Sequence, residues 1–351
     1  MPASSFEDFQ AKRYFPELDG LRTASILLVV SLHTTDPLWV PLQGNVGVTI
    51  FFVISGFLIT TLLLREEAER GQASIGAFYI RRAFRILPVY YVVLVAYILL
   101  VGVLDLTTGA AELWRALPYY LTYQNDFAPG SGFGHTWSLA IEEKYYFVWP
   151  LTFSILALRP HRLLITLALI VVSSIASRSS EGQYVATYTP ILYGCLLAQL
   201  LHRPSTYAAV RHIASTPVLV VLLALLVLQI AFLDQGGHVH VVFGALVALA
   251  MPGVLIGPGW IKPLLTNRGV SYVGRRSYAV YLVHRMAKGV VDRVVAPEGT
   301  DGEQVTRLVM IVSVSLLAAE IIYRLVEAPM IQLGRRLART RDASPARSGC
   351  A

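Results

Sequence analysis

Ten apolar stretches, each about as long as a helix that crosses a membrane, alternate with short polar segments along the chain. About 20 apolar residues in a helix span the roughly 30 Å of hydrocarbon in a bilayer. This pattern predicts an all-α integral membrane protein with about ten transmembrane helices, over residues 21–38, 46–64, 83–104, 137–158, 161–177, 185–201, 217–233, 239–257, 271–291 and 308–326.

The composition also indicates a membrane protein. Of the 351 residues, 55% are hydrophobic and only 15% are charged, which is too apolar for a soluble protein of this length. We expect a multi-pass protein of the plasma (inner) membrane. The two cysteines, Cys195 and Cys350, form neither a disulfide framework nor a metal motif, and no metal site is predicted.

Lysine and arginine indicate the orientation, because the cytoplasmic loops of membrane proteins collect these residues. With the N-terminus inside, most of the 29 Lys and Arg fall in cytoplasmic segments, so both termini are predicted to be cytoplasmic. We expect a cytoplasmic segment at 1–20, a membrane-embedded domain at 21–333 and a disordered basic cytoplasmic tail at 334–351. The net charge of +7 follows from this bias and does not indicate nucleic-acid binding.

Arg22 and His33 lie in the first apolar stretch, eleven residues apart. On a helix this spacing returns both side chains to nearly the same face, about 16 Å apart in depth. Ionisable groups inside a bilayer are costly and usually face a protein interior or an aqueous cavity. The pair therefore predicts a functional site, and the alternative is an interfacial anchor with a structural histidine.

Two further stretches place titratable groups at a similar depth. His33 and His284 are expected about 18 and 20 Å above the cytoplasmic edge, and Glu142 about 22 Å above it. Glu143 is adjacent and points about 100° away, so we expect one glutamate in the site and the other in a structural role, with Glu142 preferred. A purely structural alternative pairs these glutamates with nearby cations, namely Lys144, Arg285 or Lys288.

Arg82 and Arg85 are three residues apart at the predicted cytoplasmic end of the third stretch, so they share a helical face. Arginine binds phosphate through bidentate, charge-assisted hydrogen bonds. Arg22 lies at the same level, and the histidine and glutamate layer lies some 16 to 20 Å deeper. A coenzyme A thioester fits this spacing, with its phosphates at one end and its acyl group at the other. Ordinary anchoring at the membrane edge is the alternative for these arginines.

Several motifs, in order along residues 16–335, resemble the acyltransferase type 3 family of integral membrane proteins. They are Leu18-Asp-Gly-Leu-Arg22 followed by His33, Gly47-Val-Thr-Ile-Phe-Phe-Val-Ile-Ser-Gly56, Arg82-x-x-Arg85 before Pro88, Thr136-Trp-Ser-Leu-x-x-Glu142-Glu143, Gly274-x-x-Ser-Tyr-x-x-Tyr-Leu-x-His284, and Glu327-x-Pro329. Lys144 and Arg285 depart from the usual family pattern and place two cations near the expected site.

The resemblance implies transfer of an acyl group, most often acetyl, from cytoplasmic acyl-CoA to a hydroxyl of a carbohydrate, glycolipid, exopolysaccharide or secondary metabolite. It also implies that Arg22, His33, Arg82 and Arg85 are functional positions, with the arginines binding the donor. Some members carry an extracellular esterase-like domain. We expect this chain to be a standalone form without one.

Acyl transfer needs a base for the acceptor hydroxyl and a group that stabilises the oxyanion. His33 is the expected base, oriented by Glu142, Glu143 or Asp36. His284 is expected to donate to the oxyanion or to the leaving thiolate. Direct transfer and a covalent acyl-histidine intermediate both remain open at this point.

Two other classes of protein share some of these features. A polytopic transporter or exporter also buries charges, but it usually shows internal repeats and broken helices, and neither is visible in the sequence. A binding protein would hold acyl-CoA without turning it over. The acceptor is harder to predict: the external loop at 105–136 is rich in aromatic and polar residues, which suit either a sugar or the membrane interface.

Overall fold

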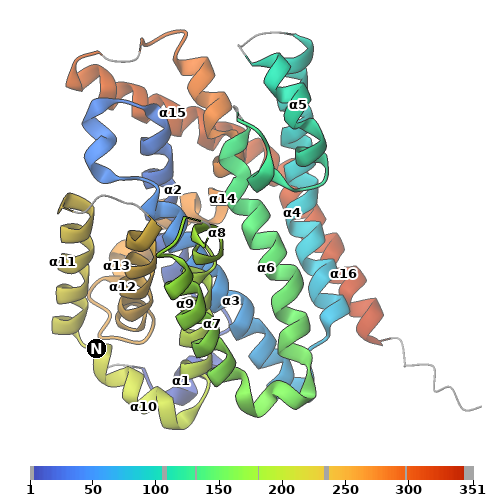
Figure 1. Ribbon diagram of the computed structural model, residues 1–351, viewed down its shortest axis with the longest axis vertical. Coiled ribbons are helices and arrows are strands. Elements are labelled where there is room, and N and C mark those ends of the chain that lie inside the picture. The colour runs from blue at the N-terminus through green and yellow to red at the C-terminus, as the bar shows by residue number, and fades with distance from the viewer. Residues whose placement is uncertain are drawn as a thin grey trace, which may run out of the picture.

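Most of the long helices of the protein run along the same axis of the molecule (Figure 1). This computed structural model describes residues 4–104, 109–130, 133–180, 182–232, 237–296 and 299–343. The described residues contain no β-strand, which confirms the predicted all-α class.

The helices of the first half are α1 (Phe6–Ala11), α2 (Pro16–Thr34), α3 (Val46–Arg70), α4 (Ile75–Tyr97), α5 (Ala110–Leu121), α6 (Trp137–Ser154) and α7 (Arg162–Ala176). Those of the second half are α8 (Gln183–Ala186), α9 (Thr189–Leu201), α10 (Pro204–Ile213), α11 (Thr216–Phe232), α12 (Gly237–Leu255), α13 (Lys262–Leu265), α14 (Arg268–Val291), α15 (Asp301–Ile322) and α16 (Ala328–Ala343). Short 3₁₀ or π segments are η1 (Pro37–Leu42), η2 (Ile98–Val103), η3 (Asn125–Phe127), η4 (Gly134–Thr136), η5 (Leu156–His161) and η6 (Tyr323–Glu327).

Each of the ten predicted stretches coincides with a helix, but fewer helices have the length and composition of a membrane span. Among the described residues five do, and six if the bent pair α10 and α11 is one span. Three of the others, α2, α6 and α14, carry several charged residues, and the apolar part of α12 is short, over His240–Leu255. The helices indicate a multi-pass membrane protein, whereas the count of ten and the cytoplasmic termini stay predictions.

The C-terminal region differs from the predicted tail. Residues 334–343 continue α16, and residues 344–351 lie outside the described part of the chain. Gly334 packs against Phe84, and Ala338 is buried, so small residues let this helix lie against α4. The sequence pattern missed this contact because the helix is basic and buries only a narrow stripe. Upstream, the π segment η6 precedes Pro329, whose ring cannot continue regular helical hydrogen bonding.

Two glycines bring α3 and α9 into close contact. A Cβ atom on Gly56 would lie 1.9 Å from the carbonyl oxygen of Ile191, and one on Gly194 would lie 2.0 Å from the carbonyl oxygen of Val53. Only glycine permits such an approach of two backbones. The close approach fixes the position of Ser55, the neighbour of Gly56, in the site described below.

A fully buried guanidinium joins the ends of α2, α14 and α15. Arg307 of α15 donates to the backbone oxygen of Thr34 at 2.8 Å and to Asp36. It also donates to Asp292 Oδ1, from Nε at 3.0 Å and from Nη2 at 2.6 Å. Buried ions are stable only when they are paired and hydrogen-bonded, as here. The network holds the C-terminal end of α2, where His33 lies, against α14.

Candidate functional site

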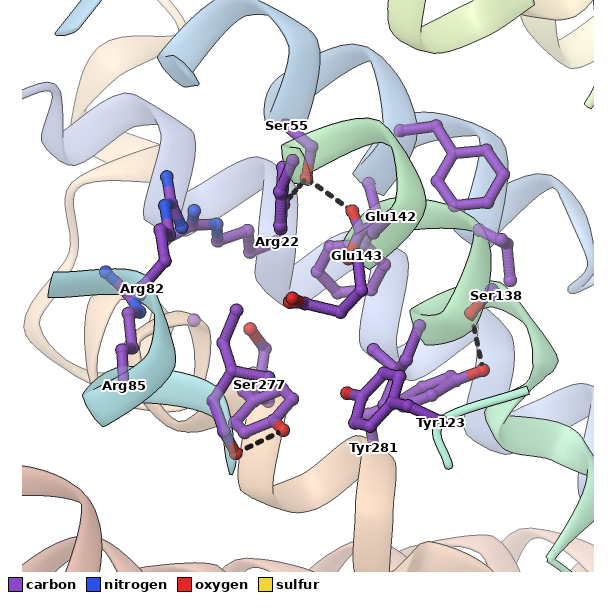
Figure 2. Close-up of a pocket in the computed structure, with 18 of the residues that line it drawn as sticks. Arg22, Ser55, Arg82, Arg85, Tyr123, Ser138, Glu142, Glu143, Ser277 and Tyr281 are labelled. Carbon is purple, nitrogen blue, oxygen red and sulfur yellow. Dashed lines mark hydrogen bonds between the residues drawn. The ribbon is translucent and has the colours of Figure 1, made fainter. Parts of the chain in front are cut away.

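A cavity opens among α2, α3, α4, α6 and α14, with an empty volume of about 820 Å³ including the part open to solvent. We call it the arginine cavity. Its charged lining residues are Arg22, Arg82, Arg85, Arg275, Glu142 and Glu143. Its other lining residues include Ser55, Tyr123, Ser138, Tyr146, Ser277, Tyr278 and Tyr281 (Figure 2).

The arginines gather on one side of the cavity (Figure 2). The guanidinium of Arg82 lies over the ring of Tyr146, 4.9 Å from its centroid. Arg22 has a long contact with Asp19, at 3.8 Å. Among the described residues, neither Arg82 nor Arg85 has a carboxylate oxygen within 4.0 Å. With four arginines and two glutamates in its lining, the cavity has an excess of positive charge and suits an anionic ligand.

Glu142 and Glu143 both line the cavity, although the sequence predicted that only one would face it. Glu142 accepts a hydrogen bond from Ser55, and Ser55 accepts one from the hydroxyl of Tyr146 at 2.9 Å. Lys144 turns away and binds Asp126 at 2.6 and 2.7 Å. The two glutamates are therefore not neutralised by their neighbour Lys144.

The other two cations of the structural alternative are also engaged or turned away. Lys288 binds Asp292 at 2.6 Å, and the side chain of Arg285 is exposed. The purely structural pairing of the glutamates with these cations is therefore absent from the described residues.

His33 and His284, predicted to lie at one depth, do lie side by side. Their ring centroids are 4.8 Å apart, with an interplanar angle of 63°. A third ring, His135, lies 6.1 Å from His33 and 4.9 Å from His284. We call these three residues the histidine cluster. Among the described residues, no group of three or more His, Cys, Asp or Glu side chains is arranged to hold a metal ion.

Backbone carbonyls set the tautomers of these rings. Nδ1 of His33 lies 2.8 Å from the carbonyl oxygen of Val29, and Nδ1 of His284 lies 2.6 Å from that of Tyr281. Since a carbonyl can only accept, both neutral rings carry their proton on Nδ1 and have a free lone pair on Nε2. Nε2 of His284 is buried and has no hydrogen-bond partner in the described part of the chain.

Tyr281 and Ser138 connect the histidine cluster to the arginine cavity. Both line the cavity, and their hydroxyl oxygens are 2.8 Å apart. The hydroxyl of Tyr281 also donates to the backbone oxygen of His135. The ring of Tyr281 lies 5.6 Å from that of His135 and 5.8 Å from that of His284, so the cluster adjoins the part of the cavity wall formed by Tyr281. Figure 2 shows Tyr281 across the cavity from Arg82 and Arg85.

None of the three groups expected to orient His33, which are Glu142, Glu143 and Asp36, is hydrogen-bonded to it among the described residues. Glu142 is bound to Ser55, and Asp36 is bound to Arg307. The carbonyl of Val29, one helical turn before His33, takes that role instead. Glu142 and Glu143 therefore lie with the predicted arginines, whereas His33 and His284 form a separate, adjacent group.

His135 and Tyr281 were not predicted from the sequence. His135 directly precedes the Thr136-Trp-Ser-Leu motif but lies in a short 3₁₀ turn outside the apolar stretch. Tyr281 precedes His284 by three residues, so the two share a helical face. Tyr281 also belongs to the motif from Gly274 to His284, so the motif and this spacing were the available signals for it.

The loop at 105–136, predicted to be external and considered as an acceptor site, is partly structural. Residues 105–108 and 131–132 lie outside the described part of the chain. Asn125 and Tyr120 are buried, and the hydroxyl of Tyr90 lies within 3.1 Å of Asn125 Oδ1 and donates to the Tyr120 carbonyl at 2.9 Å. These two loop residues hold the loop on α4.

Residues 15–324 match the model of a family described as an acyltransferase domain. The chain belongs to this acyltransferase family. The match confirms the resemblance to the acyltransferase type 3 proteins drawn from the sequence motifs. All residues of the arginine cavity and of the histidine cluster, from Arg22 to His284, lie within the matched range.

Several relatives of this acyltransferase are named O-acetyltransferases. The chain is 28% identical to peptidoglycan O-acetyltransferase OatA of Listeria monocytogenes, over 92% of this chain and 57% of the relative. It is 29% identical to a putative peptidoglycan O-acetyltransferase of Bacillus subtilis, over 93% and 56%, respectively. It is 27% identical to a putative O-acetyltransferase of Staphylococcus aureus, over 94% and 59%.

The chain therefore spans a little over half the length of these relatives. No solved structure matches it significantly.

Proposed function

We propose that this protein is a membrane O-acetyltransferase that moves an acyl group, most simply acetyl, from cytoplasmic acyl-CoA to a hydroxyl of a glycan. The main support is the arginine cavity, where Arg22 of α2 and Arg82 and Arg85 of α4 meet two glutamates of α6. Arginines that only anchor a protein at a membrane edge do not need to line one common cavity. The family and the names of its relatives support acyl transfer as the chemistry.

The arginines are proposed to bind the phosphates of the donor. A guanidinium makes two parallel, charge-assisted hydrogen bonds to a phosphate and stays charged at any physiological pH. Arg82 and Arg85 lie in the second and third turns of α4, near the end that we place at the cytoplasmic face of the plasma membrane. In this arrangement the donor enters from the cytoplasm, and its acyl group points toward Tyr281 and the histidine cluster.

His33 is the proposed general base. Its Nδ1–H donates to Val29, so Nε2 is free to take the proton of the acceptor hydroxyl. The hydroxyl oxygen attacks the thioester carbonyl, and collapse of the tetrahedral intermediate breaks the C–S bond and releases coenzyme A as its thiolate. The proton taken from the acceptor then goes to the thiolate, so the reaction is balanced without any further reactant.

His284 is the proposed partner of His33 in this proton transfer. With its only proton on Nδ1, neutral His284 can accept a proton at Nε2 but cannot donate one. It can therefore donate to the leaving thiolate only after it has received a proton. A covalent acyl-histidine would be an alternative route, and trapping of labelled acyl on the protein distinguishes the two.

Glu142 and Glu143 are proposed to set the charge of the arginine cavity. Before the donor binds, their negative charges partly balance the positive charges of the arginines. When the donor binds, they repel its phosphates toward the arginine side of the cavity. The proposed acceptor is a glycan, because two of the relatives are named for peptidoglycan.

We also propose ten spans with both termini in the cytoplasm.

The test is release of coenzyme A from labelled acetyl-CoA by the purified protein in proteoliposomes, with soluble peptidoglycan fragments as acceptors. We expect acceptor-dependent thiol release and labelled acceptor in the wild type, and neither in His33→Ala. Tight binding of acetyl-CoA without turnover on any acceptor would instead indicate a binding protein, and uptake of label into the vesicle lumen would indicate a transporter.

A further inference from the structure

A second cavity lies next to the arginine cavity along α3 and has a different chemical character. Its empty volume is about 760 Å³, including the part open to solvent. Its lining residues come from α3, α6, α8, α9 and α12, and they are Asn45, Val48, Thr49, Phe52, Trp137, Gln183, Ala186, Thr187, Pro190 and His240. None of them is Asp, Glu, Lys or Arg, so we call it the neutral cavity.

The polar side chains of the neutral cavity form an ordered group. Asn45 Nδ2 lies 3.4 Å from His240 Nε2, and Thr49 Oγ1 lies 3.0 Å from His240 Nδ1. An amide nitrogen can only donate, so Nε2 of His240 accepts and its proton is on Nδ1, where it donates to Thr49. The hydroxyl proton of Thr49 is then directed elsewhere. The group offers neutral donors and acceptors rather than a charge.

An aromatic ring and a second amide complete the lining. Trp137, the first residue of α6, is 38% exposed and meets the buried ring of Phe52 edge-on, with centroids 6.4 Å apart. In the described part of the chain, neither the indole N–H of Trp137 nor the exposed amide of Gln183 has a hydrogen-bond partner. An apolar aromatic face beside neutral hydrogen-bonding groups suits a ligand that has both C–H surfaces and hydroxyl groups, as a sugar ring does.

The two cavities share part of their walls. Val48 and Phe52 line both cavities, and Trp137 of the neutral cavity is followed directly by Ser138 of the arginine cavity. Val48 and Phe52 are therefore part of the wall between a ligand in the neutral cavity and the arginine cavity. The N-terminal end of α3 is also the outer end in the proposed topology, opposite to the end at which the donor enters.

We propose that the neutral cavity binds an uncharged sugar unit of the acceptor and presents its hydroxyl toward the arginine cavity, at the wall formed by Val48 and Phe52. This inference rests on the proposed acyl transfer and adds the place and the chemical class of the second substrate. Charged sugars are disfavoured, because the lining offers no opposite charge to compensate for their desolvation.

The experiment measures binding of chitotetraose, an uncharged sugar oligomer, to the full chain in detergent by calorimetry, and binding of coenzyme A in parallel. We expect Trp137→Ala to weaken chitotetraose binding at least tenfold and Gln183→Ala to weaken it severalfold. Coenzyme A binding is expected to change less than twofold in both variants, which also shows that they are folded. The matched control is Trp260→Ala, which removes another exposed indole that lines neither cavity.

Three results would overturn the inference: no chitotetraose binding by the wild type, affinities within twofold of wild type in both variants, or tighter binding of the charged oligomer tetragalacturonate. Failure of the proposed function gives a different result, namely absence of coenzyme A binding and of thiol release in the wild type. Chitotetraose binding that depends on Trp137 would still support the neutral cavity as a sugar site in that case.

Discussion

The centroids of the imidazole rings of His33 and His284 lie 4.8 Å apart, although His33 belongs to α2 near the beginning of the chain and His284 to α14 near its end. Each ring donates from Nδ1 to a backbone carbonyl, so each has its Nε2 lone pair free. Two potential proton acceptors thus lie together behind the cavity that we propose for the donor.

Replacing His33 by alanine is expected to lower acceptor-dependent transfer by about 10²- to 10⁴-fold, the usual contribution of a positioned general base. Binding of acetyl-CoA is expected to stay the same, because His33 does not line the arginine cavity. Steady-state and binding measurements on the same proteoliposomes check both points. Exposed His161→Gln serves as the control, and equal losses in the two variants would contradict the proposed role.

Two adjacent arginines provide a matched pair for the donor site. Arg82 lines the arginine cavity, whereas Arg81 turns away and binds Glu66 at 3.1 Å. A hydrogen bond to a charged group contributes about 1.5–3 kcal/mol, so Arg82→Ala is expected to weaken coenzyme A binding by about 10- to 100-fold. Arg81→Ala is expected to leave it within about twofold, since surface ion pairs contribute little.

The same pair tests whether the phosphates are the bound groups. Pantetheine, which lacks the nucleotide and its phosphates, should bind equally well to wild type and Arg82→Ala. A loss of pantetheine binding in this variant would show that Arg82 supports the cavity rather than the phosphates.

Arg307 is expected to be essential for stability. Its side chain is fully buried, and its removal would leave Asp36 buried without a partner. Removing one member of a buried ion pair typically costs about 3–5 kcal/mol. Thermal unfolding of Arg307→Ala in detergent should show a large decrease in midpoint. Arg324→Ala is the control, because it breaks an ion pair with Glu320 on the same long helix, but the Arg324 side chain is 75% exposed. This variant should change the unfolding midpoint little.

Glycine substitutions test the contact between α3 and α9. Gly56→Ala would place a methyl group against the carbonyl of Ile191 and should separate the two helices, with loss of thermal stability and displacement of Ser55. At Gly289 of α14 a Cβ would meet nothing within 4 Å, so Gly289→Ala should stabilise the helix by up to about 1 kcal/mol. Equal effects of the two substitutions would contradict the close packing.

Helical spacing accounts for what could be predicted of the site. The separation of Arg82 and Arg85 by three residues placed both on one face, and both line the arginine cavity. The position of each residue along its predicted helix placed His33, His284 and Glu142 at a similar depth in the membrane. Depth does not show which way a helix is rotated about its axis or which helices are neighbours. The partners of Glu142 and Asp36, which are Ser55 and Arg307, therefore became apparent only in the structure.

Periodicity likewise located the helices better than the membrane spans. The segment Arg268–Val291 forms one continuous helix, α14. Its charged residues make it too polar to be recognised as a membrane span from composition alone. The contact of α16 with α4 depends on Gly334 and Ala338, two small residues in a basic segment that reads as a tail. Contacts through small residues depend on the shape of the partner helix, and this shape cannot be predicted from the hydrophobicity of the sequence.

The burial of the histidine cluster bears on how selective the proposed reaction is. His284 is fully buried, and His33 is half-buried. A thioester activated beside buried His284 would meet fewer water molecules than one in open solvent, and water is the competitor of the sugar hydroxyl. By excluding water from this place, the packing of α2 against α14 would conserve acetyl-CoA while no glycan is bound.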